Sequence, residues 1–129
     1  MLELAPFPDD PVGQMKLYEY KNCSTCRKAI KYLDARGVAY ERIPIRETPP
    51  THDELRSMLK YLDGDEKRLF NTSGGDYLAM NLKDTLPDMD LDAKIQLLHE
   101  NGNLVKRPFL IGKDLGVTGF KEAEWDALF

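Results

Sequence analysis

The chain has 129 residues, of which 42% are hydrophobic and 31% are charged. This length allows one domain with a proper hydrophobic core and requires no disulfide crosslinks. The net charge of −4 argues against direct, nonspecific nucleic-acid binding, because such binding needs a positive surface. We find no apolar run long enough to span a bilayer and no signal peptide before the predicted fold, so we expect no membrane association.

The first part of the chain has the pattern of a strand, a helix and a second strand. We expect the proline-rich residues 1–14 to form a flexible leader. Apolar and polar residues alternate over 15–20, which predicts a half-buried strand. A helical stretch at 27–33 follows and ends at Gly37, a predicted C-cap, before a second strand at 38–45. A βαβ unit of this size has parallel strands.

The middle of the chain, about residues 50–101, is predicted to be a block of helices. Thr51 and Glu54 have the spacing of a capping box that opens the first of them. Further helical segments are predicted at 66–70, 77–85 and 91–100, the last of them ending at Gly102.

The end of the chain has the pattern of two strands and a helix. The apolar run 109–111 predicts a buried strand, and 117–119 predicts an edge strand that forms a hairpin with it. A short helix at 122–129 follows, with Trp125 and Leu128 predicted to face the core.

The two cysteines of the chain, Cys23 and Cys26, lie where the first strand passes into the first helix. A thiol at a helix N-terminus faces unpaired backbone N–H groups and the positive end of the helix dipole, which favours the thiolate. The thiolate is the reactive form, and a second cysteine three residues on can close a disulfide with it. The spacing therefore indicates thiol redox chemistry in the reducing cytoplasm.

Two other interpretations of the cysteine pair stay open at this point. A closed zinc site needs four ligands, and the remaining candidates, His52 and His99, are expected to lie far apart on separate helices. Alternatively, both cysteines are inert core residues, because free cysteine is often simply buried. We expect no bound metal.

Three segments carry a resemblance to a known family. They are residues 21–29 (KNCSTCRKA), 46–55 (RETPPTHDEL) and 107–110 (RPFL). Together with the order of elements, they resemble the arsenate reductase/Spx family, whose members are glutaredoxin-like proteins with a helical insertion. The resemblance covers residues 15–129 and implies an α/β, thioredoxin-like domain in which one mixed sheet is flanked by helices.

The resemblance also implies roles for four residues. Cys23 matches the nucleophile of the family, and Cys26 matches the resolving thiol of its two-cysteine branch. Arg107 matches an arginine that binds oxyanions or polarises the cysteine. The peptide bond between Arg107 and Pro108 is expected to be cis, with Pro108 beside the redox cysteine.

The chain departs from the arsenate reductases at two basic positions. The second arginine of those enzymes falls near Asn71, and the third falls near Phe120 and Lys121, of which only Lys121 is basic. Losing two of three guanidiniums predicts poor arsenate reduction. Arg68 is a candidate replacement from a neighbouring turn.

Further candidates surround the cysteines. Asn22 precedes the nucleophile and is a candidate to position it or a bound anion. Ser24 and Thr25 are candidate hydrogen-bond donors to the Cys23 thiolate, or else they satisfy the start of the helix. Arg27 either tunes the charge of the thiolate or is a solvated surface arginine.

The polar loop at 70–74 is a candidate rim of the site. Asn71 and Ser73 offer donors that suit an anion or a thiol adduct, although a helix-capping turn is the alternative. The turn at Gly64 lies near the place where Spx regulators contact RNA polymerase, and its alternative role is simply to end a helix.

Three functions therefore compete. The first is a cytoplasmic thiol–disulfide oxidoreductase without a bound cofactor, reduced by glutathione or by a thioredoxin/glutaredoxin system, with a small thiol or a redox protein as its partner. The second is an Spx-like redox-switched regulator that binds the RNA polymerase alpha subunit. The third is a family member that keeps the fold and has lost the chemistry. We expect a monomer.

Overall fold

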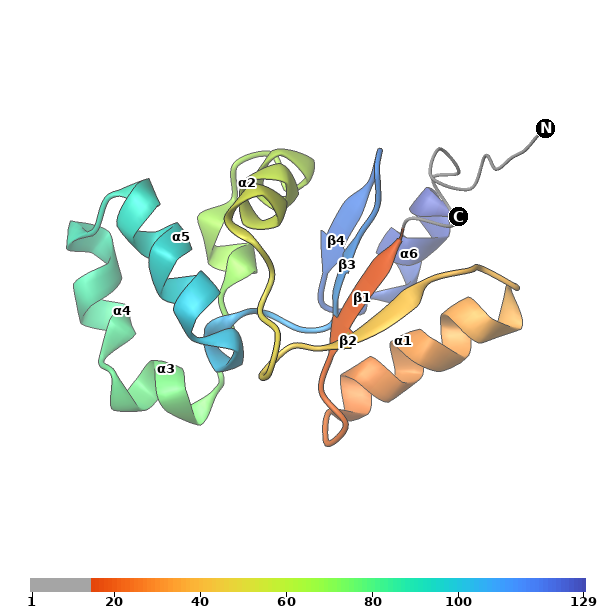
Figure 1. Cartoon of the computed structure of the whole chain (residues 1–129), viewed down its shortest axis with the longest axis horizontal. Helices are drawn as coiled ribbons and strands as arrows, with labels where there is room; N and C mark the ends of the chain where they lie inside the picture. Colours follow the sequence, from red (N-terminus) through yellow and green to blue (C-terminus); the bar gives the residue numbers. More distant parts are fainter. Residues whose placement is uncertain (1–14) are drawn as a thin grey trace.

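Figure 1 shows the computed structural model, which describes residues 15–129. The predicted flexible leader, residues 1–14, lies outside the described residues. The strands are β1 (Lys16–Glu19), β2 (Glu41–Pro44), β3 (Phe109–Ile111) and β4 (Gly116–Thr118). The α-helices are α1 (Ser24–Ala35), α2 (His52–Tyr61), α3 (Gly75–Ala79), α4 (Leu82–Thr85), α5 (Leu91–Glu100) and α6 (Glu122–Leu128). Short 3-10 helices are η3 (Glu66–Leu69), η4 (Leu86–Asp88) and η5 (Gly102–Leu104).

The four strands form one mixed sheet in the order β2-β1-β3-β4. β1 and β2 run parallel, with Leu17 opposite Arg42. β3 is antiparallel to both its neighbours, so that Leu110 pairs with Leu17 on one side and with Val117 on the other. The predicted order of βαβ, helical insertion and ββα is confirmed, as is the mixed sheet of a thioredoxin-like fold.

Each face of the sheet has its own hydrophobic core, because side chains alternate along a strand. Leu17 points to one face, where α1 and α6 contribute Leu33 and Trp125. Tyr18 and Phe109 belong to the other core, which the helices of the insertion cover. Figure 1 shows this arrangement, with α2 beside the sheet and α3, α4 and α5 beyond it.

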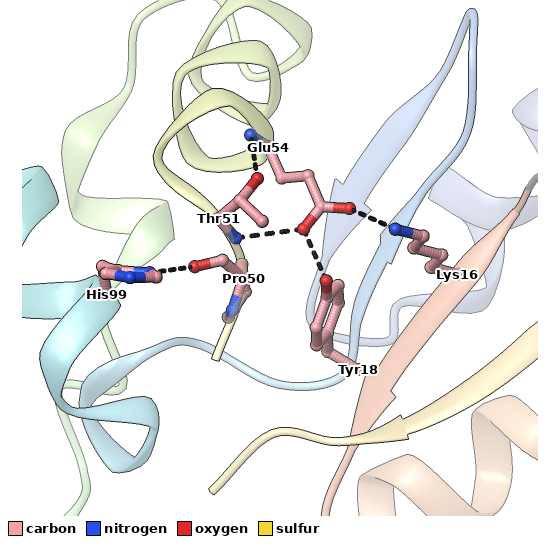
Figure 2. A network of polar contacts seen from close by, with 6 residues as sticks. All are labelled: Lys16, Tyr18, Pro50, Thr51, Glu54 and His99. Atoms are coloured by element: carbon pink, nitrogen blue, oxygen red, sulfur yellow. Dashed lines mark hydrogen bonds and ion pairs between the residues drawn. The ribbon is translucent and has the colours of Figure 1, made fainter. Parts of the chain in front are cut away.

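The capping box at the start of α2 also ties the insertion to the sheet (Figure 2). Thr51 Oγ1 accepts from the Glu54 N–H, and the Thr51 N–H donates back to Glu54 Oε1. The same carboxylate accepts a 2.5 Å hydrogen bond from the Tyr18 hydroxyl and lies 3.2 Å from Lys16 Nζ. The predicted capping box is confirmed, and β1 supplies two further partners for its glutamate.

The insertion differs from prediction in its middle helix. The segment predicted as one helix over 77–85 is two short helices, α3 and α4, separated at Asn81. Asn81 adopts a left-handed conformation with φ of 55°, which asparagine tolerates better than most residues. The chain therefore turns where continuous helical periodicity was expected.

The structure corrects two predictions near helix ends. The helix predicted at 91–100 is confirmed as α5, but its C-cap is Asn101, and Gly102 begins η5. A Cβ at Gly102 would meet the Ile45 carbonyl oxygen at 1.9 Å, so glycine is needed there for close backbone packing. In α6, Trp125 is fully buried as predicted, but Leu128 is 37% exposed at the end of the helix.

The two histidines lie side by side, contrary to prediction. α2 packs against α5, which brings the ring centroids of His52 and His99 to 4.4 Å. His52 Nε2 lies 2.7 Å from Gln96 Oε1. His99 Nδ1 lies 2.9 Å from the Pro50 carbonyl oxygen, a contact drawn in Figure 2. Both rings thus have polar partners within the insertion.

None of the helices formed by residues 15–129 is both long enough and apolar enough to cross a membrane.

Candidate functional site

Cys23 is the N-cap residue of α1, in extended backbone with φ of −101° and ψ of 112°. Its Sγ accepts a 3.2 Å hydrogen bond from the Cys26 N–H, and its own N–H donates to the Tyr20 carbonyl oxygen. The sulfur therefore occupies the position where a capping oxygen normally binds the first turn. The side chain is partly exposed, so a reactant can reach the sulfur.

Cys26 lies in the first turn of α1 and is fully buried. Burial and the hydrogen bond with Cys23 together raise the pKa of its thiol to about 12, while the charge of Arg107 acts in the opposite direction. Both cysteines are free thiols. The pair thus combines one accessible sulfur with one protonated, shielded sulfur.

Arg107 precedes β3, and its peptide bond to the buried Pro108 is cis, as expected from the family resemblance. Its Nη1 atom is buried and has no hydrogen-bond partner among residues 15–129. A buried donor of this kind is costly unless something satisfies it. Arg107 therefore has a buried donor without a partner among residues 15–129, and it lies close enough to Cys26 for its charge to act on that thiol.

Two further residues join Arg107, and neither was found from the sequence. The Arg107 guanidinium carbon lies 5.0 Å from the centroid of the Tyr20 ring, and that of Arg46 lies 4.8 Å from the same ring. Arg46 Nη1 also donates a 2.7 Å hydrogen bond to the Tyr20 hydroxyl. Tyr20 follows β1 and Arg46 follows β2. Because parallel strands end at the same edge of a sheet, their positions after adjacent strands were the available signal.

A cavity of about 180 Å³ lies beside these arginines. Its lining contains both guanidinium residues and one carboxylate, and the full set is Arg46, Asn71, Gly74, Gly75, Asp76, Asn103 and Arg107. The predicted candidate Asn71 is thus brought to Arg107, whereas Ser73 is exposed and is not part of this lining.

The other predicted residues lie around the start of α1. Asn22 donates a 3.2 Å hydrogen bond to the Tyr20 hydroxyl, which lowers the Tyr20 pKa; burial opposes this effect and the charge of Arg46 adds to it. Arg27 Nη1 donates to the Lys21 carbonyl oxygen at 2.9 Å and so fastens the loop before Cys23. Ser24 is exposed and Thr25 is half-buried.

The predicted replacement arginine is engaged elsewhere. Arg68 forms an ion pair of 2.9 Å with Glu124 of α6, and its carbonyl oxygen accepts from the Thr118 hydroxyl. Lys121 is an exposed residue at the start of α6. Within the described chain, residues 15–129, no cluster of three or more His, Cys, Asp or Glu side chains could hold a metal ion.

A mixed sheet with a Cys-x-x-Cys pair at the start of its first helix and a cis-proline before β3 places the protein in the class of thioredoxin-like thiol proteins. The model of the ArsC family matches residues 18–128. The chain belongs to the ArsC family.

Relatives agree with this assignment over nearly the whole chain. YusI of Bacillus subtilis (strain 168) is 38% identical over 112 residues, covering 87% of this chain and 95% of YusI. The crystal structure of a possible arsenate reductase from Streptococcus mutans UA159 superimposes with a TM-score of 0.83 at 38% identity, covering 91% of this chain and 99% of the other.

The chain is also similar to a protein that is named as a regulator. The regulatory protein MgsR of Bacillus subtilis (strain 168) is 30% identical over 112 residues, covering 86% of each chain. Family membership is therefore compatible with an enzyme and with a regulator.

Proposed function

We propose that the protein is a thiol–disulfide oxidoreductase in which Cys23 is the nucleophile and Cys26 is the resolving thiol. The observation that carries this proposal is the contrast within the pair. Cys23 is accessible at a helix N-terminus, whereas Cys26 is buried beside it with a pKa raised to about 12. An attacking thiolate needs access, and a resolving thiol is best kept protonated until it is needed.

The proposed reaction has two exchange steps. The Cys23 thiolate attacks one sulfur of a disulfide substrate, forming a mixed disulfide and releasing the other sulfur as a thiolate. Cys26 then attacks Cys23, closes the Cys23–Cys26 disulfide and releases the second substrate thiol, while the Cys26 proton passes to a leaving thiolate. The two cysteines lose two electrons and the substrate gains them. An external thiol, from glutathione or a thioredoxin/glutaredoxin system, returns the pair to the reduced state.

The first step also prepares the second. Cys23 holds the Cys26 pKa up through its hydrogen bond and its negative charge. Once Cys23 is part of a mixed disulfide, that charge is gone and deprotonation of Cys26 becomes easier. The positive charge of Arg107 also lowers the Cys26 pKa and so stabilises the thiolate that forms on Cys26.

The experiment is a glutathione-coupled assay with a small disulfide substrate, comparing wild type with Cys23→Ser and Cys26→Ser. We expect Cys23→Ser to abolish turnover and Cys26→Ser to accumulate a mixed disulfide visible as added mass. Arg42→Ala is a matched control, because Arg42 is an exposed arginine of β2 outside the cavity lining. Full activity of Cys23→Ser would refute the mechanism.

An arsenate-dependent arm of the same assay tests the oxyanion reaction. We expect a poor rate, because the family arginines predicted near Asn71 and Lys121 are missing and Arg68 is paired with Glu124. A Cys23-dependent arsenate rate comparable to the disulfide rate would contradict this expectation.

A regulator is the second candidate function, and the similarity to MgsR favours it. In that case the Cys23–Cys26 disulfide is a switch, and the partner is the RNA polymerase alpha subunit. Co-purification of the alpha subunit with the protein in one redox state would support this function. Absence of the subunit in both states would count against it. For either function we propose a cytoplasmic location, where both thiols are kept reduced.

A further inference from the structure

The exposed side of α1 and the loop before it are positively charged. Residues 20–33 contain four basic side chains, Lys21, Arg27, Lys28 and Lys31, and no acidic one, whereas the whole chain has a net charge of −4. All four are exposed, and none of them forms an ion pair with another residue of the range 15–129. We call these four side chains the basic stripe. A positive surface thus lies next to Cys23 on a protein whose total charge is negative.

Helix geometry aligns the basic stripe with the accessible cysteine. Arg27 and Lys31 follow Cys23 by four and eight residues, and positions four apart lie on one side of an α-helix. The Arg27 N–H donates to the Cys23 carbonyl oxygen at 3.1 Å. The Arg27 guanidinium donates to the Lys21 carbonyl oxygen, which holds the loop before Cys23 against α1. The buried side of α1, which carries Ala29, packs in the core instead.

The charges of α1 do not stabilise the helix that carries them. Acidic side chains in the first turn and basic ones in the last turn stabilise a helix through its dipole. α1 has neither, and Arg27 and Lys28 lie in its first half. α2 has the favourable arrangement, with Asp53 and Glu54 in its first turn and Lys60 in its last. Helix stability therefore does not explain the basic stripe, whereas a role at the surface does.

We propose that the basic stripe docks an acidic protein and so delivers the disulfide of that protein to Cys23. This inference rests on the proposed oxidoreductase function and names the class of its macromolecular substrate. Complementary charges speed the encounter of two proteins and favour one orientation over others. The partner is a protein in which carboxylates surround the disulfide that Cys23 attacks.

The length and position of the stripe favour a protein as its occupant. At 1.5 Å per residue, Lys31 lies about 12 Å from Cys23 along the helix axis, which is beyond the reach of a small disulfide bonded at Cys23. A nucleic acid is also negative, but it offers no sulfur to Cys23, and the net charge of −4 opposes nonspecific binding. Figure 1 shows α1 away from α3, α4 and α5, so the insertion does not cover it.

The test measures the first exchange step alone, in the full chain with Cys26→Ser. Three peptides of equal length carry one central cysteine, joined through a disulfide to nitrothiobenzoate, and this cysteine is flanked by glutamates, glutamines or lysines. The Cys23 thiolate attacks the peptide sulfur and forms a mixed disulfide, and nitrothiobenzoate leaves as a coloured thiolate with the electrons of the broken bond. Absorbance gives the second-order rate constant at low and at high salt.

We expect the glutamate peptide to react about tenfold faster than the lysine peptide at low salt. The difference should shrink in molar salt, where the Debye length is about 3 Å. Lys31→Glu should slow the glutamate peptide about tenfold and leave the glutamine peptide unchanged, which shows that the reactivity of Cys23 is intact.

Lys113→Glu is the matched control, because it makes the same change of charge at a distant place. Lys113 is exposed and follows β3, whose end at Ile111 pairs with Lys16 at the start of β1. Cys23 follows the other end of β1. Lys113→Glu should therefore react with all three peptides as the parent protein does. A thermal unfolding curve checks that both variants fold.

Several outcomes would overturn the proposal. Equal rates for the three peptides, or an equal loss for all three in Lys31→Glu, would refute a docking surface. If the symmetric disulfide of nitrothiobenzoate, a small anion, depends on Lys31 as strongly as the glutamate peptide does, the stripe takes small anions and the protein partner is wrong. If a single-stranded oligonucleotide blocks the reaction better than a cysteine-free glutamate peptide of equal charge, the stripe binds nucleic acid and the proposal fails.

The failure of the proposed function gives a different result. If Cys23 reacts with none of the peptides, the oxidoreductase function is refuted. Binding of the cysteine-free glutamate peptide, followed by NMR, then still tests the stripe, because it should weaken in Lys31→Glu and not in Lys113→Glu. Reaction of Cys23 with every peptide regardless of charge would refute the docking surface alone.

Discussion

Cys23 and Cys26 differ in accessibility although they lie together at the start of α1. The sulfur of Cys23 is reached from solvent and receives a backbone N–H, while Cys26 has no exposed surface. Access and thiolate content together decide how fast a cysteine reacts.

We therefore expect iodoacetamide near neutral pH to alkylate Cys23 and to leave Cys26 unmodified on the same timescale. Peptide mass spectrometry of samples taken over time measures the two rates separately. Unfolding the protein in urea should remove the difference, which serves as the control. Similar rates for both cysteines in the folded protein would contradict the assignment of roles.

The environment of Tyr20 also depends on single side chains. Its hydroxyl accepts from Asn22 and from Arg46, so it links the loop before Cys23 to the turn after β2. We expect Tyr20→Phe to keep the ring that both arginines face and to lose these hydrogen bonds. Urea unfolding should then show Tyr20→Phe to be less stable than wild type, and unchanged stability would contradict this linking role of the hydroxyl.

At the scale of elements, Gly102 shows how closely the helical insertion packs against the segment that follows β2. A Cβ there would overlap the Ile45 carbonyl oxygen, a backbone atom that cannot move aside cheaply. The start of η5 can approach the turn after β2 this closely only because residue 102 has no side chain.

We expect Gly102→Ala to lower the free energy of unfolding by about 1–3 kcal/mol, the usual cost of overpacking. Gly75→Ala is the control, because a Cβ at Gly75 meets nothing within 4 Å and alanine is the better helix residue. Urea unfolding of both variants measures the difference. Equal stability of the two variants would show that the backbone at Ile45 adapts.

Most elements were predictable because their signals are local. The alternation in β1, the capping box of α2 and the apolar run of β3 each lie within a few residues, and each was found. The break at Asn81 was missed because continuous helical periodicity gave no sign of a left-handed residue. Leu128 was assigned to the core by its spacing from Trp125, but α6 ends there and leaves it partly exposed.

The site was predictable only in part, for a physical reason. The cysteine pair could be recognised from the sequence because the strand before it and the helix after it have local sequence patterns. Tyr20 and Arg46 are ordinary residues in sequence, and only the parallel pairing of β1 with β2 brings them together. The neighbouring positions of His52 and His99 likewise depend on the packing of α2 against α5.

At the scale of the whole molecule, Glu54 joins the insertion to the sheet (Figure 2). Burial alone would raise its pKa, but hydrogen bonds from Tyr18 and Thr51 and the charge of Lys16 outweigh it, and the pKa lies below its ordinary value of 4.5. Burial and the bond to Glu54 raise the pKa of Tyr18, so this phenol stays protonated as the donor.

The lowered pKa of Glu54 sets the sign of a pH effect. The folded state holds the ionised carboxylate better than the unfolded chain does, so this stabilisation is present above pH 4.5 and is lost as the pH falls through the folded pKa. We expect Glu54→Gln to lose part of the acid dependence of stability, measured by urea unfolding at several pH values. Glu47→Gln, at an exposed glutamate, should retain the wild-type dependence. Identical pH profiles for wild type and Glu54→Gln would contradict the role of this carboxylate.

Both edges of the sheet are protected from pairing with a strand of another molecule, which bears on aggregation. Open sheet edges recruit strands from other molecules. At β4, Gly116 lies against Tyr61 and Met58 of α2, and the Thr118 hydroxyl is bonded to η3. At the opposite edge, β2 is short, exposes the charged Glu41 and Arg42, and ends in Pro44, which has no N–H to donate. Both edges of the sheet are therefore poor templates for a further strand. The protein should resist edge-to-edge association even at high concentration.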